Sequence, residues 1–152
     1  GNQNEFYDPA QYGPELSRGF PGLRVWLTIK IFGAERYRAA LKEKRDLAVW
    51  AAERISRIPG IVMDAPPQLS LFAFHLEGAG LETIEAQNAA TESLMHRVTN
   101  RGQLMLSGAM AGNRYLGRVC VLSFRTRRSQ MEMCVQQLTE ETAALLAHAA
   151  AL

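Results

Sequence analysis

Arg118 is the residue of this 152-residue chain whose surroundings point most clearly to chemistry. It lies in the run YLGRVCVLSFR, where Leu116, Val119 and Val121 predict a mostly buried strand. A buried guanidinium is costly unless it meets a carboxylate or several acceptors. On the residues alone two interpretations stay open: an internal ion pair or an edge position that reaches water, and a planar two-donor clamp for the carboxylate of a ligand.

Three histidines, His75, His96 and His148, are the other side chains that could hold a metal or move a proton. Their neighbours in the sequence supply no metal-ligand spacing, so we expect structural or solvated positions. No GxGxxG, Walker or GxSxG motif occurs. The loop 78–82 (GAGLE) leads into an expected helix and offers at most a weak anion site.

A cluster of three arginines, Arg125, Arg127 and Arg128, lies where the last expected strand enters the last expected helix. Cations at a helix N-terminus oppose the helix dipole, which speaks against a purely stabilising role. Contact with a phosphate group and a solvated or interface position therefore both stay open for this cluster.

The composition predicts one globular domain that binds neither nucleic acid nor a membrane. Apolar residues make up 47% and charged residues 21% of the chain, and the net charge is only +2. No apolar run reaches the roughly 18 residues of a membrane-spanning helix and no signal peptide is visible, so we expect a cytoplasmic protein. Cys120 and Cys134 form no metal spacing and are expected to be buried free thiols.

The first third of the chain changes pattern at two points. Residues 1–22 hold three prolines and three glycines, which forbid a long helix and predict an extended arm. Residues 23–32 alternate between apolar and other side chains, which on pattern alone fits a strand. Residues 34–58 carry an apolar stripe with charges opposite, which predicts a long amphipathic helix that ends at Pro59-Gly60.

The remaining residues predict strands and helices that alternate in pairs. Two short strands are expected on either side of Pro66-Pro67, and a helix with Thr83 as its N-cap follows. Two more strands are expected around Gly108, Gly112 and Asn113, and a final helix follows them. The expected spans are strands at 61–65, 68–76, 103–106 and 115–122, and helices at 82–99 and 127–150. Because tight turns join antiparallel strands, this order predicts an α+β two-layer sandwich: a four-stranded antiparallel sheet covered by helices.

The segment 16–33, LSRGFPGLRVWLTIKIFG, carries a resemblance to a known family. It resembles the stretch that follows the catalytic core of the group II pyridoxal-phosphate (PLP) decarboxylases, which act on aromatic amino acids, histidine or glutamate. Gly19 and Pro21 depart from the family pattern, which has arginines there. The matching residues are Leu16, Ser17, Arg18, Phe20, Leu23, Arg24, Trp26 and Gly33.

This resemblance implies a fold and a division of the chain. It implies the small C-terminal domain of the fold-type I PLP enzymes, with a helix rather than a strand over 23–32. Residues 1–22 would be an extended arm from the upstream large domain, 23–58 a helical connection and 59–152 the small α+β domain. The PLP-binding domain of the same protein and a second copy in a homodimer are the implied partners.

The resemblance also implies a function for the full-length protein. The family's cofactor-binding lysine lies in a His-Lys pair, and this chain has none, so PLP is expected in the full-length amino-acid decarboxylase but not on this fragment, which would be inactive alone. Arg118 would bind the α-carboxylate of the amino-acid substrate, and Ser17 and Arg18 would border the substrate pocket. An ordinary turn serine remains the alternative for Ser17.

Two other functional classes are considered beside this one. A stand-alone ferredoxin-like α+β module that binds a ligand or regulates a partner would have to be self-contained, which the apolar residues of the arm speak against. An assembly domain without a ligand predicts that Arg118 is paired internally. Neither the amino-acid substrate nor the choice between decarboxylase and aldehyde synthase follows from these residues.

Overall fold

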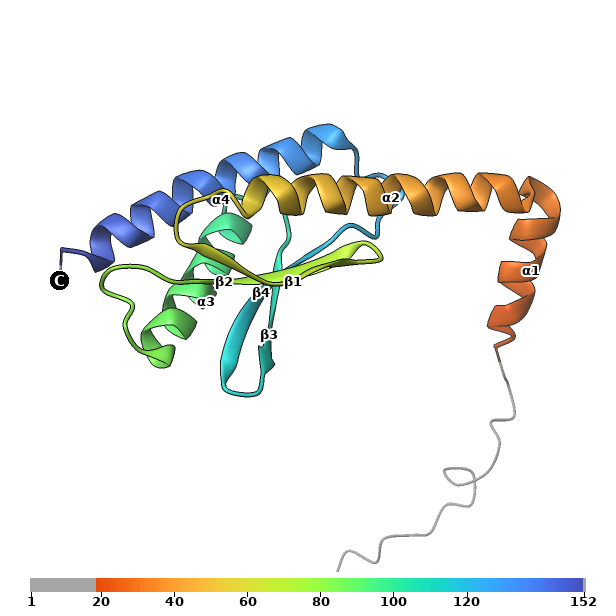
Figure 1. Ribbon diagram of the computed structural model, residues 1–152. Coiled ribbons are helices and arrows are strands. Elements are labelled where there is room, and N and C mark those ends of the chain that lie inside the picture. The colour runs from red at the N-terminus through yellow and green to blue at the C-terminus, as the bar shows by residue number, and fades with distance from the viewer. Residues whose placement is uncertain (1–18, 152) are drawn as a thin grey trace, which may run out of the picture. The chain divides into compact units, whose positions relative to one another are not determined.

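The first of two compact units holds one complete helix. The computed structural model describes residues 19–151 (Figure 1), and the chain divides into units of residues 1–38 and 39–152. Helix α1 (Pro21–Phe32) confirms the helix that the resemblance implies, so the strand pattern is wrong here. The predicted extended arm over 1–22 is wrong at its end, because Pro21 and Gly22 already belong to α1. Pro21 occupies the first turn, where its missing N–H and its φ angle suit a helix. The alternation that suggested a strand is part of an apolar surface that surrounds most of the helix.

Helix α1 buries none of its residues. Large apolar side chains are exposed along its whole length, including Trp26 at 55%. A helix that is apolar on most sides is normally enclosed by other parts of a protein. The exposed large apolar residues of this segment are Phe20, Leu23, Val25, Trp26, Leu27, Ile29, Ile31 and Phe32.

The second unit is built on a four-stranded antiparallel sheet. Its strands are β1 (Ile61–Gln68), β2 (Leu71–Leu76), β3 (Ser107–Ala111) and β4 (Arg114–Cys120), in the spatial order β1-β2-β4-β3. Three helices contribute buried residues to this unit: α2, which spans Ala34–Ile55 and begins in the first unit, α3 (Ile84–Asn100) and α4 (Arg128–Ala149). The predicted four-stranded α+β sandwich is confirmed.

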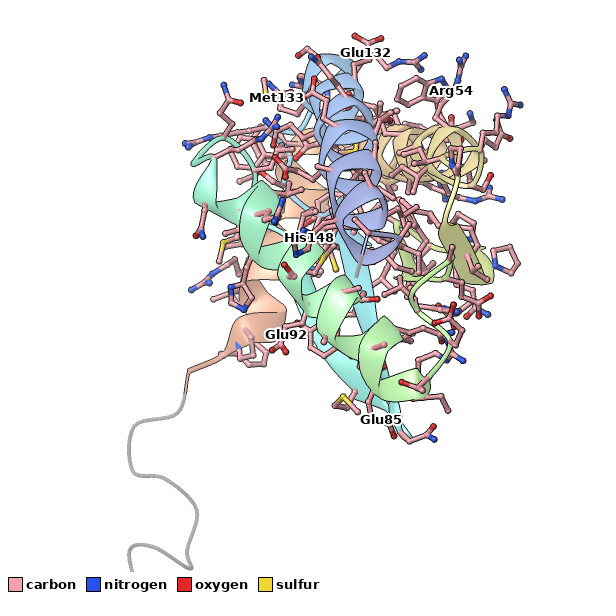
Figure 2. All side chains as sticks on the ribbon, turned by 90° about the vertical axis from the view of Figure 1, so that its left-hand side faces the viewer. Arg54, Glu85, Glu92, Glu132, Met133 and His148 are labelled. Carbon is pink, nitrogen blue, oxygen red and sulfur yellow. The ribbon has the colours of Figure 1, made fainter. Side chains whose placement is uncertain are left out.

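One face of the sheet packs on the helices. On β2, Phe72, Phe74 and Leu76 are at most 2% exposed, whereas Leu71, on the opposite face, is 39% exposed. This alternation places every second side chain in the core. The outer surfaces of α3 and α4 carry exposed polar side chains such as Glu92 and His148 (Figure 2). The helices supply the other half of the core with Ala48, Ala51, Ile55, Leu94, Met95, Val98, Met131, Cys134 and Leu138.

The predicted N-cap of α3 is confirmed. Thr83 precedes the helix in an extended conformation, and its hydroxyl accepts a hydrogen bond from the backbone N–H of Ala86 at 3.1 Å. This contact satisfies one of the free N–H groups of the first turn. It sets the beginning of the helix that packs closely on β4.

The predicted turn at Pro66-Pro67 is wrong. Both prolines lie inside β1, and the turn to β2 is formed by Leu69 and Ser70. Two facts make the prolines tolerable: β1 is an edge strand, and its pairing is irregular on both sides of Ala65. Proline lacks the N–H of a ladder hydrogen bond, so it occurs at edges and bulges.

The predicted strand at 103–106 is also wrong, because β3 is formed by the five residues that follow. The two-residue turn Gly112-Asn113 joins β3 directly to β4. The ladder therefore begins beside the turn, where Ala111 lies opposite Arg114, and β3 consists of the residues just before the turn. Gly108, expected in a turn, lies in the strand opposite Gly117. A Cβ at Gly108 would lie 2.0 Å from the hydroxyl oxygen of Tyr115, so the tyrosine ring uses the space that this glycine leaves.

The C-terminal end of helix α2 differs slightly from expectation. Helix α2 ends at Ile55 instead of residue 58, and a hydrogen bond from the N–H of Ile58 to the carbonyl of Ile55 closes a tighter turn there. The N–H of Ile61 then bonds the carbonyl of Ile58 and begins β1. The Pro59-Gly60 pair lies in this connection, as predicted.

The two cysteines differ in exposure, and burial of Cys120 is a wrong prediction. Cys120 ends β4 and is exposed, whereas Cys134 lies in the core, where burial raises its pKa to about 12. At pH 8 about one Cys134 thiol in ten thousand would be a thiolate, the form that reacts.

We expect iodoacetamide at pH 8 to alkylate Cys120 quickly and Cys134 only after unfolding, as peptide mass spectrometry would measure. Equal labelling of both in the folded chain would contradict this expectation.

Candidate functional site

Arg118 lies near the middle of the sheet face that points away from the helices, here called the open face. It pairs with Ala73 of β2 on one side and with Ser107 of β3 on the other. Because paired residues of antiparallel strands point to the same face, all three side chains meet there. The neighbours along β4 on this face are Leu116 and Cys120.

The guanidinium of Arg118 has a single hydrogen-bond partner among the described residues. Its Nη2 donates to the hydroxyl of Ser107 at 3.3 Å. Its Nε is buried and has no acceptor. No ion pair joins Arg118 to a carboxylate of residues 19–151, so an internal ion pair does not account for it there. A buried donor without an acceptor costs about 1–3 kcal/mol, and such a group calls for a partner.

Other arginines of the second unit do find acids or amides. Arg101 donates to Glu140 at 2.7 Å and pairs with Glu141 at 2.6 Å, and these contacts raise its pKa. Arg114, four residues before Arg118 on the same face, donates to the side chain of Gln87 at 2.9 Å and lies 3.7 Å from Glu77. Arg118 differs from both because its remaining N–H groups have no acceptor in the described chain.

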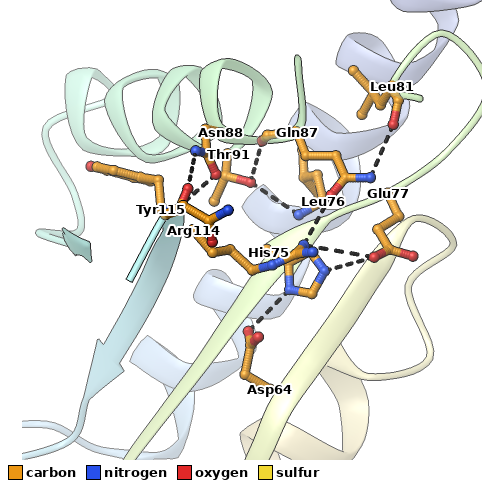
Figure 3. A network of polar contacts seen from close by, with 11 residues as sticks. Asp64, His75, Leu76, Glu77, Leu81, Gln87, Asn88, Thr91, Arg114 and Tyr115 are labelled. Atoms are coloured by element: carbon orange, nitrogen blue, oxygen red, sulfur yellow. Dashed lines mark hydrogen bonds and ion pairs between the residues drawn. The ribbon is translucent and has the colours of Figure 1, made fainter. Parts of the chain in front are cut away.

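A polar network at one end of the open face explains His75 (Figure 3). The imidazole is 5% exposed; its Nδ1 lies 3.1 Å from Asp64 and its Nε2 lies 2.9 Å from Glu77. The hydrogen bond with His75 is the main cause that lowers the pKa of Glu77. Glu77 therefore stabilises the folded chain fully at a pH above the ordinary pKa of a glutamate. This contribution is lost as the pH falls through the lowered pKa of the folded state. Both ring nitrogens are engaged within the chain, which fits the structural one of the two positions, structural or solvated, that we expect for His75.

The same network ties α3 to the sheet. The side-chain oxygen of Asn88 accepts the backbone N–H of Tyr115 at 2.7 Å. The hydroxyl of Thr91 accepts the N–H of Leu76 at 3.0 Å and donates to the carbonyl of Gln87 at 2.7 Å (Figure 3). These contacts join one helix to β2 and β4, and so hold the strand that carries Arg118.

The arginine cluster before α4 is engaged in contacts of its own. Arg127 donates to Glu43 of α2 at 3.0 Å, and its backbone N–H donates to Gln130 at 2.8 Å. Arg128 lies with its guanidinium carbon 3.4 Å from the ring centre of Trp50 and pairs with Glu132. These contacts favour a structural role over a phosphate site.

In the loop 78–82, a carboxylate of the loop itself occupies the backbone donor that could have bound an anion. The N–H of Gly80 donates to the carboxylate of Glu82 at 2.9 Å, so an acid of the chain occupies that donor. The described residues also contain no group of three or more histidine, cysteine or acidic side chains that could hold a metal. Within residues 19–151, no helix has both the length and the apolar content that crossing a membrane requires.

Comparisons with known proteins agree with the resemblance. No protein-family profile matches the chain. It is 30% identical over 139 residues to the aromatic-L-amino-acid decarboxylase of Bacillus atrophaeus, a match that covers 87% of this chain and 28% of that protein. It is 26% identical over 116 residues to the histidine decarboxylase of Mus musculus, which covers 76% of this chain and 16% of that protein.

Solved structures give the same result for the fold. The Oryza sativa TDC structure with PLP superposes with a TM-score of 0.79 at 18% identity, over 91% of this chain and 30% of that one. The 4-hydroxyphenylacetaldehyde synthase of Rhodiola rosea superposes with a TM-score of 0.77 at 21% identity, with the same coverages. The chain spans less than a third of these relatives. It matches the C-terminal part of the group II PLP-dependent decarboxylases.

The three lysines of this decarboxylase fragment lie on helices α1 and α2. Lys44 is 6% exposed, and its ammonium donates to the carbonyl of Thr126 at 2.7 Å. Lys42 donates to Asp46 at 2.6 Å, and Lys30 lies over the ring of Trp26. None of the three lysines follows a histidine in the sequence.

Two of the three predicted site residues, Ser17 and Arg18, lie outside the described residues. The structure brings Arg118 together with Ser107, a residue that our sequence reasoning missed. The signal for it is present: Ser107 and Arg118 are each five residues from the turn Gly112-Asn113. A two-residue hairpin turn pairs residues at equal distances on either side, so placing the turn at these two residues predicts the contact in this decarboxylase fragment.

Proposed function

We propose that this chain is the C-terminal domain of a PLP-dependent amino-acid decarboxylase and that Arg118 binds the α-carboxylate of the substrate. The supporting observation is the guanidinium on the open face, which has a buried Nε without an acceptor and no acidic partner among the described residues. A carboxylate offers two oxygens in the plane that a guanidinium can bind with two parallel hydrogen bonds. No other described arginine combines these features.

In this function Arg118 binds and orients the substrate. Its guanidinium presents a rigid planar fork of N–H donors, which fixes the direction from which a carboxylate can bind. Ala73, across the strand pair, is small and leaves space beside the guanidinium. PLP, bound by the upstream domain, would supply the electron sink for loss of carbon dioxide.

The contacts of the domain with the rest of the enzyme belong to the same proposal. The exposed apolar surface of α1 supports burial against the upstream PLP-binding domain or a second copy in a homodimer. The residues before α1 would form the arm, the helices up to residue 58 the helical connection, and 59–152 the domain that closes over the cofactor cleft. Ser17 and Arg18 would border the pocket, and the protein would act in the cytoplasm.

The test compares the 152-residue chain with the full-length gene product. Each is mixed with PLP, its absorbance is recorded before and after borohydride reduction, and release of carbon dioxide from amino acids is measured. We expect a reducible internal adduct and decarboxylation only in the longer protein. A specific reducible adduct on the 152 residues alone, or a gene that encodes nothing more, would replace this proposal with a stand-alone binding module.

A further inference from the structure

Ser107 is the residue of the open face that contacts the guanidinium of Arg118. It is the fifth residue before the hairpin turn, as Arg118 is the fifth after it, and the two are direct partners in the β3–β4 ladder. A two-residue turn allows little slippage of the register, so this pairing is a stable property of the hairpin. The serine is exposed, which leaves its hydroxyl free to serve a neighbour rather than the core.

The hydroxyl of Ser107 accepts a hydrogen bond from Nη2 of Arg118 at 3.3 Å. It takes up one donor at one end of the guanidinium. Because the group is planar and rigid, a contact at one end also restrains where its other N–H groups point. Ala73 on the other side of the arginine offers no hydrogen-bonding side chain, so Ser107 is the side-chain partner that the described sheet provides.

We propose that Ser107 is a positioning residue that holds Arg118 in the orientation in which it receives a substrate carboxylate; this inference rests on the proposed function. A hydroxyl suits this role because it accepts a hydrogen bond without carrying charge. A carboxylate at the same position would neutralise the guanidinium and compete with the ligand, as Glu140 and Glu141 do at Arg101. The neutral partner leaves the full charge of Arg118 available.

The experiment uses the full-length protein and measures KM and kcat for an amino acid that it decarboxylates, together with the inhibition constant of the corresponding amine. The amine lacks the carboxylate and serves as the matched ligand. Ser107→Ala is expected to raise KM by roughly 3- to 10-fold, the range of one hydrogen bond, with kcat and amine binding unchanged. Ser107→Thr keeps the hydroxyl and should restore KM.

The variant Ser107→Asp tests the same role with a larger expected change in KM. A carboxylate beside Arg118 should capture the guanidinium, so KM is expected to rise further than in Ser107→Ala, again without an effect on the amine. Ser123→Ala is the matched control, since its hydroxyl accepts a hydrogen bond from the backbone N–H of Arg125 and lies outside β3 and β4. Its KM should equal that of the unmodified protein.

The outcomes separate the two proposals. If Arg118→Lys raises KM while Ser107→Ala and Ser107→Asp behave like the unmodified protein, the role of Ser107 is wrong and the role of Arg118 stands. If Arg118→Lys has no effect on KM, the proposed role of Arg118 is wrong, and the inference about Ser107 is wrong with it. If the Ser107 variants weaken amino acid and amine alike, Ser107 acts on the fold of the domain rather than on carboxylate binding, and the inference is overturned.

Discussion

Replacing Arg118 by alanine is expected to raise the KM of the full-length protein for its amino acid by about 10- to 100-fold. A hydrogen bond to a charged group contributes about 1.5–3 kcal/mol, and each 1.4 kcal/mol corresponds to a factor of ten in affinity. The side chain is only partly buried and has no acidic partner among the described residues, so its removal leaves no unpaired charge behind. Steady-state kinetics with the purified protein would measure the change.

The effect should fall on KM rather than on kcat. The negative charge of the carboxylate leaves this position as carbon dioxide departs, so Arg118 binds the substrate at least as strongly as the transition state. An interaction of that kind lowers KM without raising kcat. A fall in kcat with KM unchanged would contradict a binding role and would indicate that Arg118 acts on the transition state.

A matched pair of conservative variants isolates the planar clamp from the charge. Arg118→Lys keeps the charge but loses the two-donor fork, and we expect KM to rise roughly 5- to 20-fold. Arg114→Lys is the same substitution on the same strand and the same face, at a residue already engaged by Gln87 and Glu77. It should leave KM unchanged. Equal effects of the two variants would point to the general charge of β4.

The sequence predicts a helix or strand correctly where one local pattern, such as an apolar stripe or a capping residue, is stronger than the others. The apolar stripe after Gly33 and the capping residue Thr83 each predicted a helix that the structure contains. The strand pairs could be recognised from apolar runs, and the order of elements limited them to one antiparallel sheet. For α1 the local pattern predicted a strand, because a helix that is apolar on most sides also contains alternating apolar residues.

The errors arose where position within the sheet outweighs composition. Pro66 and Pro67 are turn formers in general, but the edge position of β1 lets a strand contain them. Cys120 is followed and preceded by apolar residues, yet it points to the open face and is exposed. The Ser107–Arg118 contact was missed for a related reason, since it depends on the register of β3, which the turn residues determine.

Gly80→Ala is expected to destabilise the domain by about 2–5 kcal/mol. Gly80 has φ of +80°, and a Cβ there would lie 2.3 Å from the carbonyl oxygen of Ala149, near the end of α4. The positive φ costs about 1–2 kcal/mol for a residue with a Cβ, and forcing the helix end away from the loop adds about 1–3 kcal/mol. Urea unfolding, followed by circular dichroism, would give the difference in the free energy of unfolding.

Gly102→Ala is the matched control for this prediction. Its φ of +72° is similar, but a Cβ there meets nothing within 4 Å. It should therefore lose only the backbone contribution, about 1–2 kcal/mol. If both variants lose the same free energy, the end of α4 moves aside at little cost.

A deletion of residues 149–152 makes the contact itself measurable. It removes the carbonyl that the new methyl group would strike, so Gly80→Ala should cost no more than Gly102→Ala in the shortened chain. A coupling energy of about 1–3 kcal/mol between the substitution and the deletion would then measure the close approach of loop and helix. Without such coupling the loss in Gly80→Ala would come from the loop alone. The loop leads into α3, whose Asn88 holds the backbone of β4, so this close approach joins the end of α4, through the loop and α3, to the strand that carries Arg118.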